Sequence, residues 1–467
     1  MKKIISIILS LAITVSLAAC AKTPEGNEET TGKTNTGEQK YKLADDFDYS
    51  PFALCLAIPP VLPKFPTEED YANDPDAASA MADEWSASFT ERRNASEVKT
   101  PGYESFVPRC AEEFLTSPDG ENTVCSPINI YFALAMLSEI TDGESRRQLN
   151  ALLGEENEEQ LEKTVSALWN KSYLDDGTIT CRPANSLWLR NDTEYNKTTL
   201  EKLGDIFYAQ SFSGDMSAPE YSEALRGWLN DSTNGLLKDS AEKISFDPLT
   251  VIALASSVYF SGKWADEFAQ SANTVMTFRG SKNDTETEFM HCEDMMTCKF
   301  GDNYTAVTKP LMNGAVMNFI LPDEGTDVNS LLETKGGSIF TSETHGTEIR
   351  EENVRLSVPK FDVTCDTDLI TGLKNLGVKD VFDDKISDFS PLADGAKNLY
   401  VSRADHSARV KIDEKGCEAA AFTVITVDEC AAIEITKTIE ITLDRPFIFS
   451  VTLTDGTVLF AGVINQL

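Results

Sequence analysis

Histidine is scarce in this chain of 467 residues, which contains three, at positions 291, 345 and 406. A Ser-His-Asp or Cys-His catalytic site would need one of them, and none lies in a recognisable nucleophile motif. The sequence also lacks Gly-x-Ser-x-Gly, a Gly-rich phosphate loop ending in Lys-Ser or Lys-Thr, and His-Glu-x-x-His. Because a hydrolase reading has no specific motif behind it, we expect that the protein is not an enzyme.

Basic residues are few beside acidic ones: 41 Lys and Arg against 76 Asp and Glu give a formal charge of -35. Most of the surface therefore repels phosphate backbones, and we expect no nucleic-acid partner. Cys292 and Cys298 enclose five residues and could be a metal or disulfide pair, but the spacing matches no zinc template and no second pair follows. We expect no metal and no cofactor. Nine cysteines follow Cys20, and unpaired thiols are the favoured reading at most of these positions.

Long apolar runs are absent beyond the N-terminus. Lys2 and Lys3 precede the run Ile4 to Leu17, which is shorter than the roughly 20 residues of a membrane-spanning helix and is typical of a signal peptide. The following Leu-Ala-Ala-Cys, ending at Cys20, resembles a bacterial lipobox. That resemblance implies a lipoprotein signal peptide at 1–19 and a lipidated Cys20 on the extracellular face of a bacterial cell membrane. The alternative is an ordinary cleavage site with a chance cysteine.

Composition divides the rest of the chain. Residues 20–40 contain almost no large apolar side chains and are predicted to be a flexible tether. Residues 41–100 mix a Pro-rich apolar stretch with acidic segments and are interpreted as an N-terminal extension or arm. Residues 101–467 are predicted to form one globular domain.

Within that domain, Ser126-Pro127 is a strong helix start, and the apolar run Ile128 to Ile140 predicts a helix buried almost all round. Helical spacing also groups Leu161, Val165, Leu168 and Trp169, and places Leu373 and Leu376 before Gly377 as terminator. Predicted strands are Val251–Phe260, Val316–Leu321, Val354–Thr364, Ile433–Leu443, Phe447–Leu453 and Val458–Ile464. A helix-rich first half and a strand-rich second half predict an α+β fold with a large, mostly antiparallel sheet.

The segment 411–432 reads KIDEKGCEAAAFTVITVDECAA and carries conflicting local preferences. Glu414 to Gly416 is turn material, Glu418 to Ala421 favours a helix, and Phe422 to Val427 favours a strand. Alternate positions 417, 419, 421 and 423 are all small, as a strand pressed into a crowded layer requires. A plain strand with an alanine-rich entry is the alternative.

This segment resembles the hinge of inhibitory serpins, and other serpin-like blocks occur in the family's order. They are Asn122 to Pro127, Ala184 to Leu189, Val258 to Trp264, Val316 to Glu324, Ser357 to Phe361, Leu376 to Phe382, Asp388 to Ser390, and Arg445-Pro446-Phe447 through Gly462. The resemblance covers roughly residues 103 to 467. It implies a serpin-like fold with an exposed reactive loop.

By this resemblance the protein is expected to be a monomeric, irreversible suicide-type inhibitor of a protease. The reactive bond is expected at Cys430-Ala431, flanked by Val427, Asp428, Glu429 and Ala432. The hinge comprises Glu414, Lys415, Gly416, Cys417, Glu418, Ala419, Ala420 and Ala421, and the sheet-opening region comprises Ser126, Ser256 and His406. Cys430 beside two alanines favours an elastase-like serine protease. Glu-specific and cysteine proteases are alternatives, as is a non-inhibitory serpin-like binding module on the cell surface.

The sequence departs from the family pattern at several positions. Cys417 stands where Thr or Ser is usual, and Ser256 stands where Asn is usual. Phe422 interrupts the alanine run, and its parity suggests that it would face outward, where bulk is tolerated. The segment from Ala431 to Leu443 is a few residues longer than usual, which leaves the position of the reactive bond uncertain by several residues.

Overall fold

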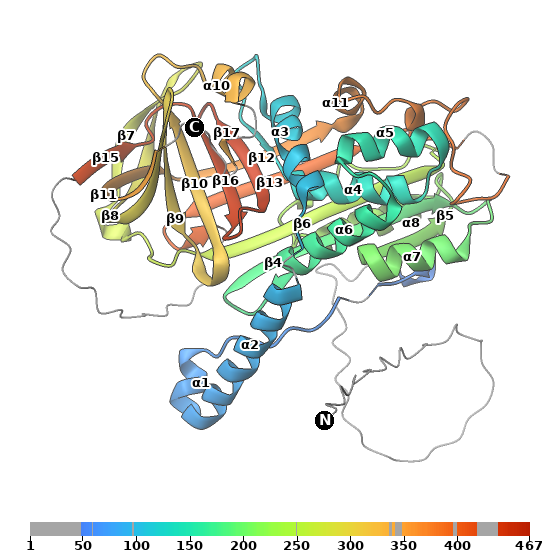
Figure 1. Cartoon of the computed structure of the whole chain (residues 1–467), viewed down its shortest axis with the longest axis horizontal. Helices are drawn as coiled ribbons and strands as arrows, with labels where there is room; N and C mark the ends of the chain where they lie inside the picture. Colours follow the sequence, from blue (N-terminus) through green and yellow to red (C-terminus); the bar gives the residue numbers. More distant parts are fainter. Residues whose placement is uncertain are drawn as a thin grey trace, which may run out of the picture. The chain divides into compact units, whose positions relative to one another are not determined.

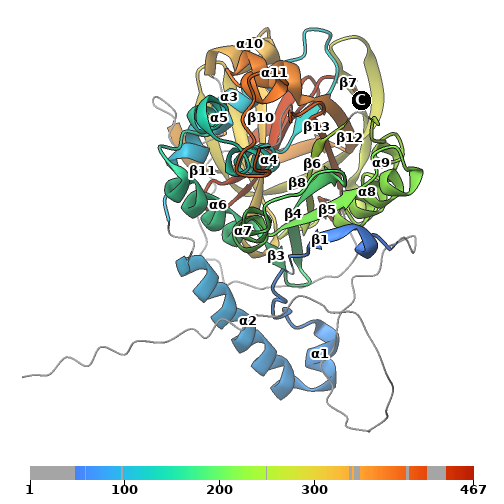
Figure 2. The same cartoon turned by 90° about the vertical axis from the view of Figure 1, so that its right-hand side faces the viewer.

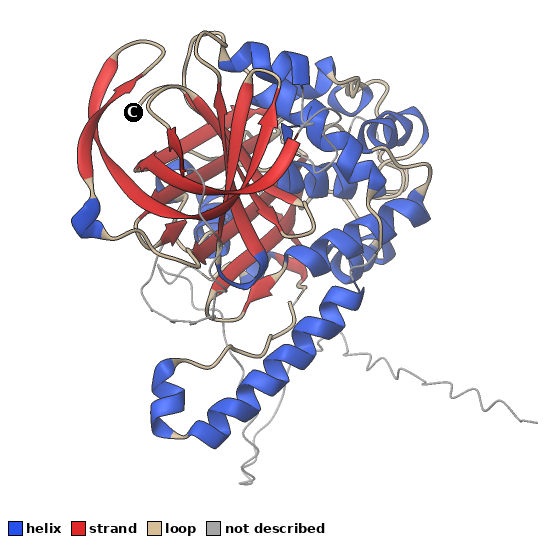
Figure 3. Ribbon diagram, turned by 60° about the vertical axis from the view of Figure 1, so that its left-hand side comes forward, coloured by secondary structure: helices blue, strands red, loops and turns tan. Residues whose placement is uncertain are grey.

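Two large sheets and a set of helices make up the protein (Figure 1). The computed structural model describes residues 48–467 except 58, 96–97, 249, 336–338, 341–347, 396–398 and 418–437. Figure 3 shows the strands gathered on one side of the molecule and most helices on the other. Helices α1 to α9 all precede residue 242, and the strands dominate the remainder of the described chain. The predicted α+β class is confirmed.

The first sheet has the strand order β1-β5-β4-β6-β14-β13-β12, and β3 pairs with β4 at its side. Its pairs are antiparallel except for β4 with β5. Its strands are β1 (Ala53–Cys55), β3 (Leu174–Asp175), β4 (Ile179–Arg190), β5 (Ala209–Gly214), β6 (Ile252–Lys263), β12 (Phe361–Asp368), β13 (Asp405–Asp413) and β14 (Gly416–Cys417).

The second sheet has the order β15-β11-β8-β9-β10-β16-β17-β2, and β7 pairs with β8. Here β11 and β15 are the parallel pair. Its strands are β2 (Thr123–Cys125), β7 (Thr274–Arg279), β8 (Asp284–Gly301), β9 (Tyr304–Pro310), β10 (Ala315–Pro322), β11 (Glu348–Pro359), β15 (Thr438–Thr442), β16 (Phe447–Leu453) and β17 (Val458–Ile464).

The helices surround the first sheet and one end of the second (Figure 2). They are α1 (Glu68–Asn73), α2 (Pro75–Ala95), α3 (Pro101–Leu115), α4 (Pro127–Glu139), α5 (Gly143–Leu153), α6 (Glu158–Ser172), α7 (Lys197–Phe207), α8 (Pro219–Ser232), α9 (Lys238–Ala241), α10 (Val328–Lys335) and α11 (Leu369–Asn375). Short 3-10 turns occur at Ser50–Phe52, Gln270–Ala272, Met312–Gly314 and Asp380–Phe382.

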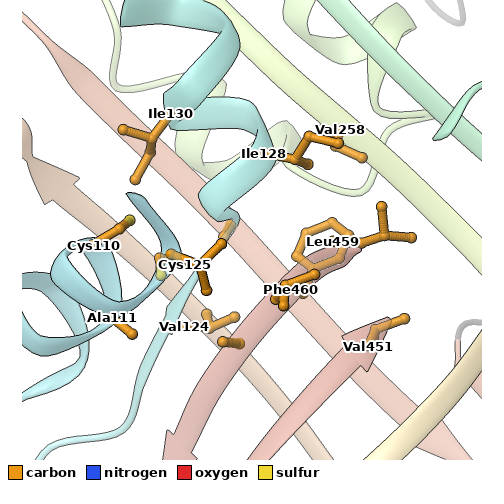
Figure 4. Packing of buried hydrophobic residues seen from close by; sticks show 14 of the residues in the cluster. Cys110, Ala111, Val124, Cys125, Ile128, Ile130, Val258, Val451, Leu459 and Phe460 are labelled. Carbon is orange, nitrogen blue, oxygen red and sulfur yellow. The ribbon is translucent and has the colours of Figure 1, made fainter. Parts of the chain in front are cut away.

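Helix α4 confirms the predicted buried helix. The Ser126 side chain accepts a hydrogen bond from the Asn129 backbone N–H, and Pro127 occupies the first turn, where its missing N–H costs nothing. All its side chains except Ala133 are buried. Its neighbours in the core come from β2, β6, β16 and β17, as Figure 4 shows for Ile128, Val258 and Leu459. The helix therefore lies at the centre of the molecule, beneath the first sheet.

Helices α6 and α11 follow the predicted spacing. The four residues grouped on α6, Leu161, Val165, Leu168 and Trp169, are all buried. After α11, Gly377 adopts φ +101°, a left-handed conformation that glycine reaches without strain and that ends the helix.

One predicted strand, Val354–Thr364, is wrong as a single element. The chain leaves β11 of the second sheet at Pro359 and enters β12 of the first sheet at Phe361. Proline lacks the N–H that would continue a ladder, so the crossing falls at Lys360. The predicted strands Phe447–Leu453 and Val458–Ile464 match β16 and β17. Of Ile433–Leu443, residues 438–442 form β15, and 433–437 lie outside the described residues.

The segment before α3 contacts the body at several places, visible where β1 lies beside β5 in Figure 2. Phe52 packs on Tyr221 of α8 with ring centroids 5.1 Å apart. The Trp85 indole N–H donates to an Asp176 carboxylate oxygen at 3.0 Å, and the Arg92 guanidinium donates to the Asn170 carbonyl at 2.7 Å. Because β1 pairs with β5, this segment also adds one short strand to the edge of the first sheet.

No disulfide joins the eight cysteines in the described part of the chain: 55, 110, 125, 181, 292, 298, 365 and 417. Cys292 and Cys298 lie six positions apart on the single strand β8, about 20 Å along an extended strand. They therefore do not pair. Among the residues that the structure describes, no helix has the length and hydropathy that crossing a bilayer requires.

Candidate functional site: the head and centre of the first sheet

The predicted hinge begins inside the first sheet. Strand β13 ends at Asp413, the chain turns, and β14 returns between β13 and β6. Gly416 pairs with Asp413 and Lys263, while Cys417 pairs with Ile412 and Gly262. A Cβ atom at position 416 would lie 2.3 Å from the Gly262 carbonyl oxygen, so only glycine fits there. Cys417 is 3% exposed and faces the core.

The turn before β14 is held by hydrogen bonds and an ion pair. The Glu414 carboxylate lies 2.6 Å from the Lys360 ammonium and accepts a hydrogen bond of 2.6 Å from the Asn273 amide. Burial works to raise the pKa of Glu414, but the hydrogen bonds from Lys360 and Asn273 outweigh it and lower that pKa. The Trp264 backbone N–H donates to the Lys415 carbonyl at 3.0 Å, and its indole N–H donates to the Asp413 carbonyl at 2.8 Å.

A second, buried polar cluster lies further down the same strands, at the N-terminus of α4. The Ser126 backbone N–H donates to His406 Nε2 at 3.0 Å, and the Ser126 hydroxyl donates to the Leu459 carbonyl at 2.7 Å. Because Nε2 accepts this bond, His406 is neutral with its proton on Nδ1. Burial lowers the pKa of His406 to about 4, against an opposing effect of the Asp366 charge.

Ser256 joins this cluster through two asparagines that the sequence analysis missed. Its hydroxyl bonds to the side-chain oxygen of Asn129 and to Asn185 Oδ1 at 2.8 Å. The Asn129 amide donates in turn to the Ser256 carbonyl at 3.0 Å. Asn129 stands one helical turn after the Ser126 cap, and Asn185 belongs to one of the serpin-like blocks, so both lay within patterns already singled out.

Several predicted site residues lie outside the described residues: Glu418, Ala419, Ala420 and Ala421 of the hinge, Val427, Asp428, Glu429 and Ala432 of the loop, the bond Cys430-Ala431, and Cys20. The described hinge residues, Glu414 to Cys417, lie at the C-terminal ends of β6 and β13, which we call the head of the gap between these strands. The described sheet-opening residues, Ser126, Ser256 and His406, meet at its centre. The two groups thus border the same gap.

Pockets lie on both faces of this gap. On one face, residues of α8, α9 and the following loop enclose a pocket with Ala253 and Ala255 of β6 and with Asp405 and Ser407 of β13. On the other face, α4 and α11 enclose a pocket with Leu254, Ser256, Ala404 and His406. Among the described residues, β6 and the chain leading into β13 are joined by one isolated bridge, Ile252 to Val401. Below β14 the sheet therefore has an incompletely paired seam.

Two other groups of polar side chains contain residue types that bind metals or transfer protons in other proteins. The carboxylates of Glu139, Glu158 and Glu162 converge closely enough to suggest a cation site, but the Lys202 ammonium occupies it, 2.7 Å from Glu139 and 2.6 Å from Glu162. His291 contacts the Ser357 hydroxyl at 2.9 Å and the Thr274 hydroxyl at 2.7 Å. It thereby ties β7, β8 and β11 together.

In the first sheet, the short strand β14 turns back between β6 and β13, and these two strands are incompletely paired below it. Residues 102–467 match the family model described as Serpin (serine protease inhibitor), and the chain belongs to the serpin family. It is 27% identical to plasminogen activator inhibitor 1 of Bos taurus over 82% of this chain and 95% of that protein. It is 28% identical to Serpin-Z2B of Triticum aestivum over 78% and 95%.

Among solved structures, the chain resembles the thermophilic serpin tengpin in its native state, with a TM-score of 0.70 and 27% identity over 78% of this chain and 93% of that one. The fold is also that of thyroxine-binding globulin in complex with thyroxine, at a TM-score of 0.65 and 21% identity. The expected serpin fold is therefore confirmed.

Proposed function

We propose that this protein is a suicide inhibitor of elastase-like serine proteases. The protease attacks the Cys430-Ala431 bond with its own serine, and the segment after Cys417 then enters the seam between β6 and β13 as a new strand. Added backbone hydrogen bonds and burial of the small side chains stabilise the inserted state. The free energy released traps the protease as its acyl-enzyme.

The observation that carries this proposal is the position of β14. Its two residues already pair with both β6 and β13, and a strand that continued this pairing would enter the seam with the correct polarity. Continued pairing needs no rearrangement of the turn at Glu414 and Lys415. It needs only separation of the strands below, at the seam that Ile252 and Val401 bridge.

The proposed specificity rests on Cys430, whose short side chain behaves as a small hydrophobe and fits a small apolar pocket. Cys430→Arg should abolish adduct formation with a pancreatic elastase and create it with trypsin, because trypsin-like pockets bind a basic residue. Each protease is mixed with each form, and heat-stable adducts are counted on a denaturing gel. An unchanged preference for elastase would remove position 430 from the reactive bond.

Two alternatives remain outcomes of this test. Adducts with a cysteine protease and none with serine proteases would change the target class. Cleavage of the loop by several proteases without any adduct would favour the non-inhibitory binding module.

We further propose that the mature protein is anchored through lipidated Cys20 on the outer face of a bacterial membrane. The apolar run before it and the small residues at 18 and 19 support this placement. A Cys20→Ser variant expressed with its own leader should lose metabolic labelling by palmitate and leave the membrane fraction. Equal labelling of both forms would contradict the anchor.

A further inference from the structure

The pocket beneath α8 and α9 contains apolar side chains from three neighbouring parts of the chain. Leu225 and Leu229 come from α8, Leu237 precedes α9, and Ile244 and Phe246 follow it. The floor is the first sheet, where the lining from β6 is Ala253, Leu254, Ala255 and Ser256. Ala253 and Ala255 have small side chains, which leave room for a larger group from elsewhere.

The register of β14 identifies which residues would reach this floor. Cys417 lies opposite Gly262 of β6 and Ile412 of β13, and both pairings are antiparallel. Each further residue of the loop therefore moves one position back along both neighbouring strands. In that register Phe422 comes to lie between Ser257 and Ser407, and Val424 between Ala255 and Asp405.

The side on which each residue falls follows from contacts of the strands themselves. Ser257 bonds to Ser232 of α8 at 2.8 Å, so odd-numbered positions of β6 face α8. Ser256 bonds to Asn129 of α4, so even-numbered positions face α4. Since directly paired residues share a face, Phe422 and Val424 fall on the α8 side. Thr423 falls beside Ser256 and His406.

We propose that the pocket beneath α8 and α9 is the receiving site for Phe422 and Val424 when the loop inserts. This inference rests on the proposed insertion and refines it. Phe422, expected from the sequence to face outward, is assigned to a pocket walled by apolar side chains of α8, α9 and the loop after α9 and lined also by Arg403, Asp405 and Ser407. The bulky Phe422 side chain would then be buried in the inserted state, next to the small side chains of Ala253, Ala255 and Ser407.

The same register accounts for the one charged residue of the early loop. Glu418 comes to lie opposite Ser261 and Lys411, on the same face as Phe422 but nearer the head of the sheet. Lys411 is exposed, so a carboxylate there meets water and a positive charge. Glu418 therefore provides a matched control: it has the same parity and the same strand but lies outside the pocket.

The test compares the thermal stability of intact and loop-cleaved protein. The full chain, purified in detergent, is cleaved in the loop with thermolysin, as checked by mass spectrometry, and melting is followed by circular dichroism for wild type, Phe422→Asp, Phe422→Ala and Glu418→Gln. Intact forms should melt alike, because the proposal brings the substituted side chains into the seam only after cleavage. Cleavage should raise the melting temperature of wild type and Glu418→Gln equally. The rise should be reduced in Phe422→Ala and lost in Phe422→Asp, which places a charge in the apolar pocket.

The outcomes separate this inference from the proposed function. A rise in wild type that Phe422→Asp retains in full would overturn the assignment of the pocket while leaving insertion intact. No rise in wild type would overturn insertion itself. Hydrogen exchange at residues 237–246 gives a second readout: protection there after cleavage in wild type, and none in Phe422→Asp, is the expected result. Equal protection in both forms would again contradict the assignment.

Discussion

The head and the centre of the first sheet are held together by different kinds of interaction. At the head, the Glu414 and Lys360 side chains form an ion pair while remaining 14% and 27% exposed. At the centre, Ser126, Asn129 and His406 are at most 3% exposed and are joined by hydrogen bonds between uncharged groups. Water and salt reach the first set and not the second. The head should therefore respond to ionic strength, and the centre to loss of a partner or to protons.

The largest effect is expected at the centre, from Asn129→Leu. This change leaves the Ser256 carbonyl without its buried donor and weakens the link to Asn185, so the free energy of unfolding should fall by about 2–4 kcal/mol. Denaturation in guanidinium chloride measures it. Asn375, whose exposed amide bonds to Glu113 at 2.8 Å, gives the matched control: Asn375→Leu should change stability little. Equal losses in both variants would mean that burial of the cluster is unimportant.

The second-largest effect is expected from acid, which should destabilise the folded protein through His406 at the centre of the sheet. The pKa of His406 is about 4 in the folded protein and about 6.5 when unfolded. Between these values the unfolded chain binds more protons, so stability is fully present above pH 6.5 and is lost as the pH falls towards 4. The loss should reach about 3 kcal/mol.

His406→Gln keeps an acceptor for the Ser126 N–H but does not titrate, so its unfolding free energy should lack this component of the pH dependence. His291→Gln is the control, since His291 lies in the second sheet and leaves His406 in place. Parallel pH profiles of wild type and His406→Gln would contradict the assignment.

A smaller effect is expected at the head. Glu414→Gln removes a partly exposed ion pair and should cost about 1 kcal/mol at low salt and less in 1 M NaCl. A double-mutant cycle with Lys360→Met isolates the pair. Glu288, which also contacts Lys360 but is 46% exposed, should show a weaker coupling. A coupling for Glu414 that is independent of salt would contradict the picture of a solvent-screened head.

The smallest effect is expected from Cys417→Thr. Both side chains are small and uncharged, so the buried position should accept the change within about 1 kcal/mol, and adduct formation should persist. Cys417→Glu, by contrast, places a charge against the core and should expel β14 from the ladder. Protease sensitivity of the hinge measures this. Similar behaviour of the two variants would show that position 417 is not buried in solution.

The sequence was most informative where local pattern and tertiary structure agree. Ser126-Pro127 and the apolar run after it predicted α4, and two β-branched runs predicted β16 and β17, because capping and periodicity are local. The division between β11 and β12 escaped prediction: both stretches alternate apolar and polar residues as a single strand would, and their membership of different sheets is visible only in space. Asn129 and Asn185 escaped because nothing in the sequence shows that they converge on Ser256.

At the hinge, too, local features were predicted from the sequence and long-range features were not. Its small residues predicted that a crowded face would receive it, and the structure places Cys417 in such a face. The pairing of Gly416 and Cys417 with both β6 and β13 could not be read from the sequence, because it depends on long-range register. That register, in turn, led to the assignment of Phe422.

The most direct test of the account is to mix the mature chain with pancreatic elastase and analyse the products on a denaturing gel and by mass spectrometry. The account predicts a heat- and detergent-stable adduct of one protease with one inhibitor, and release of a C-terminal peptide beginning at Ala431. Complete cleavage in the loop with free, active protease and no adduct would contradict it.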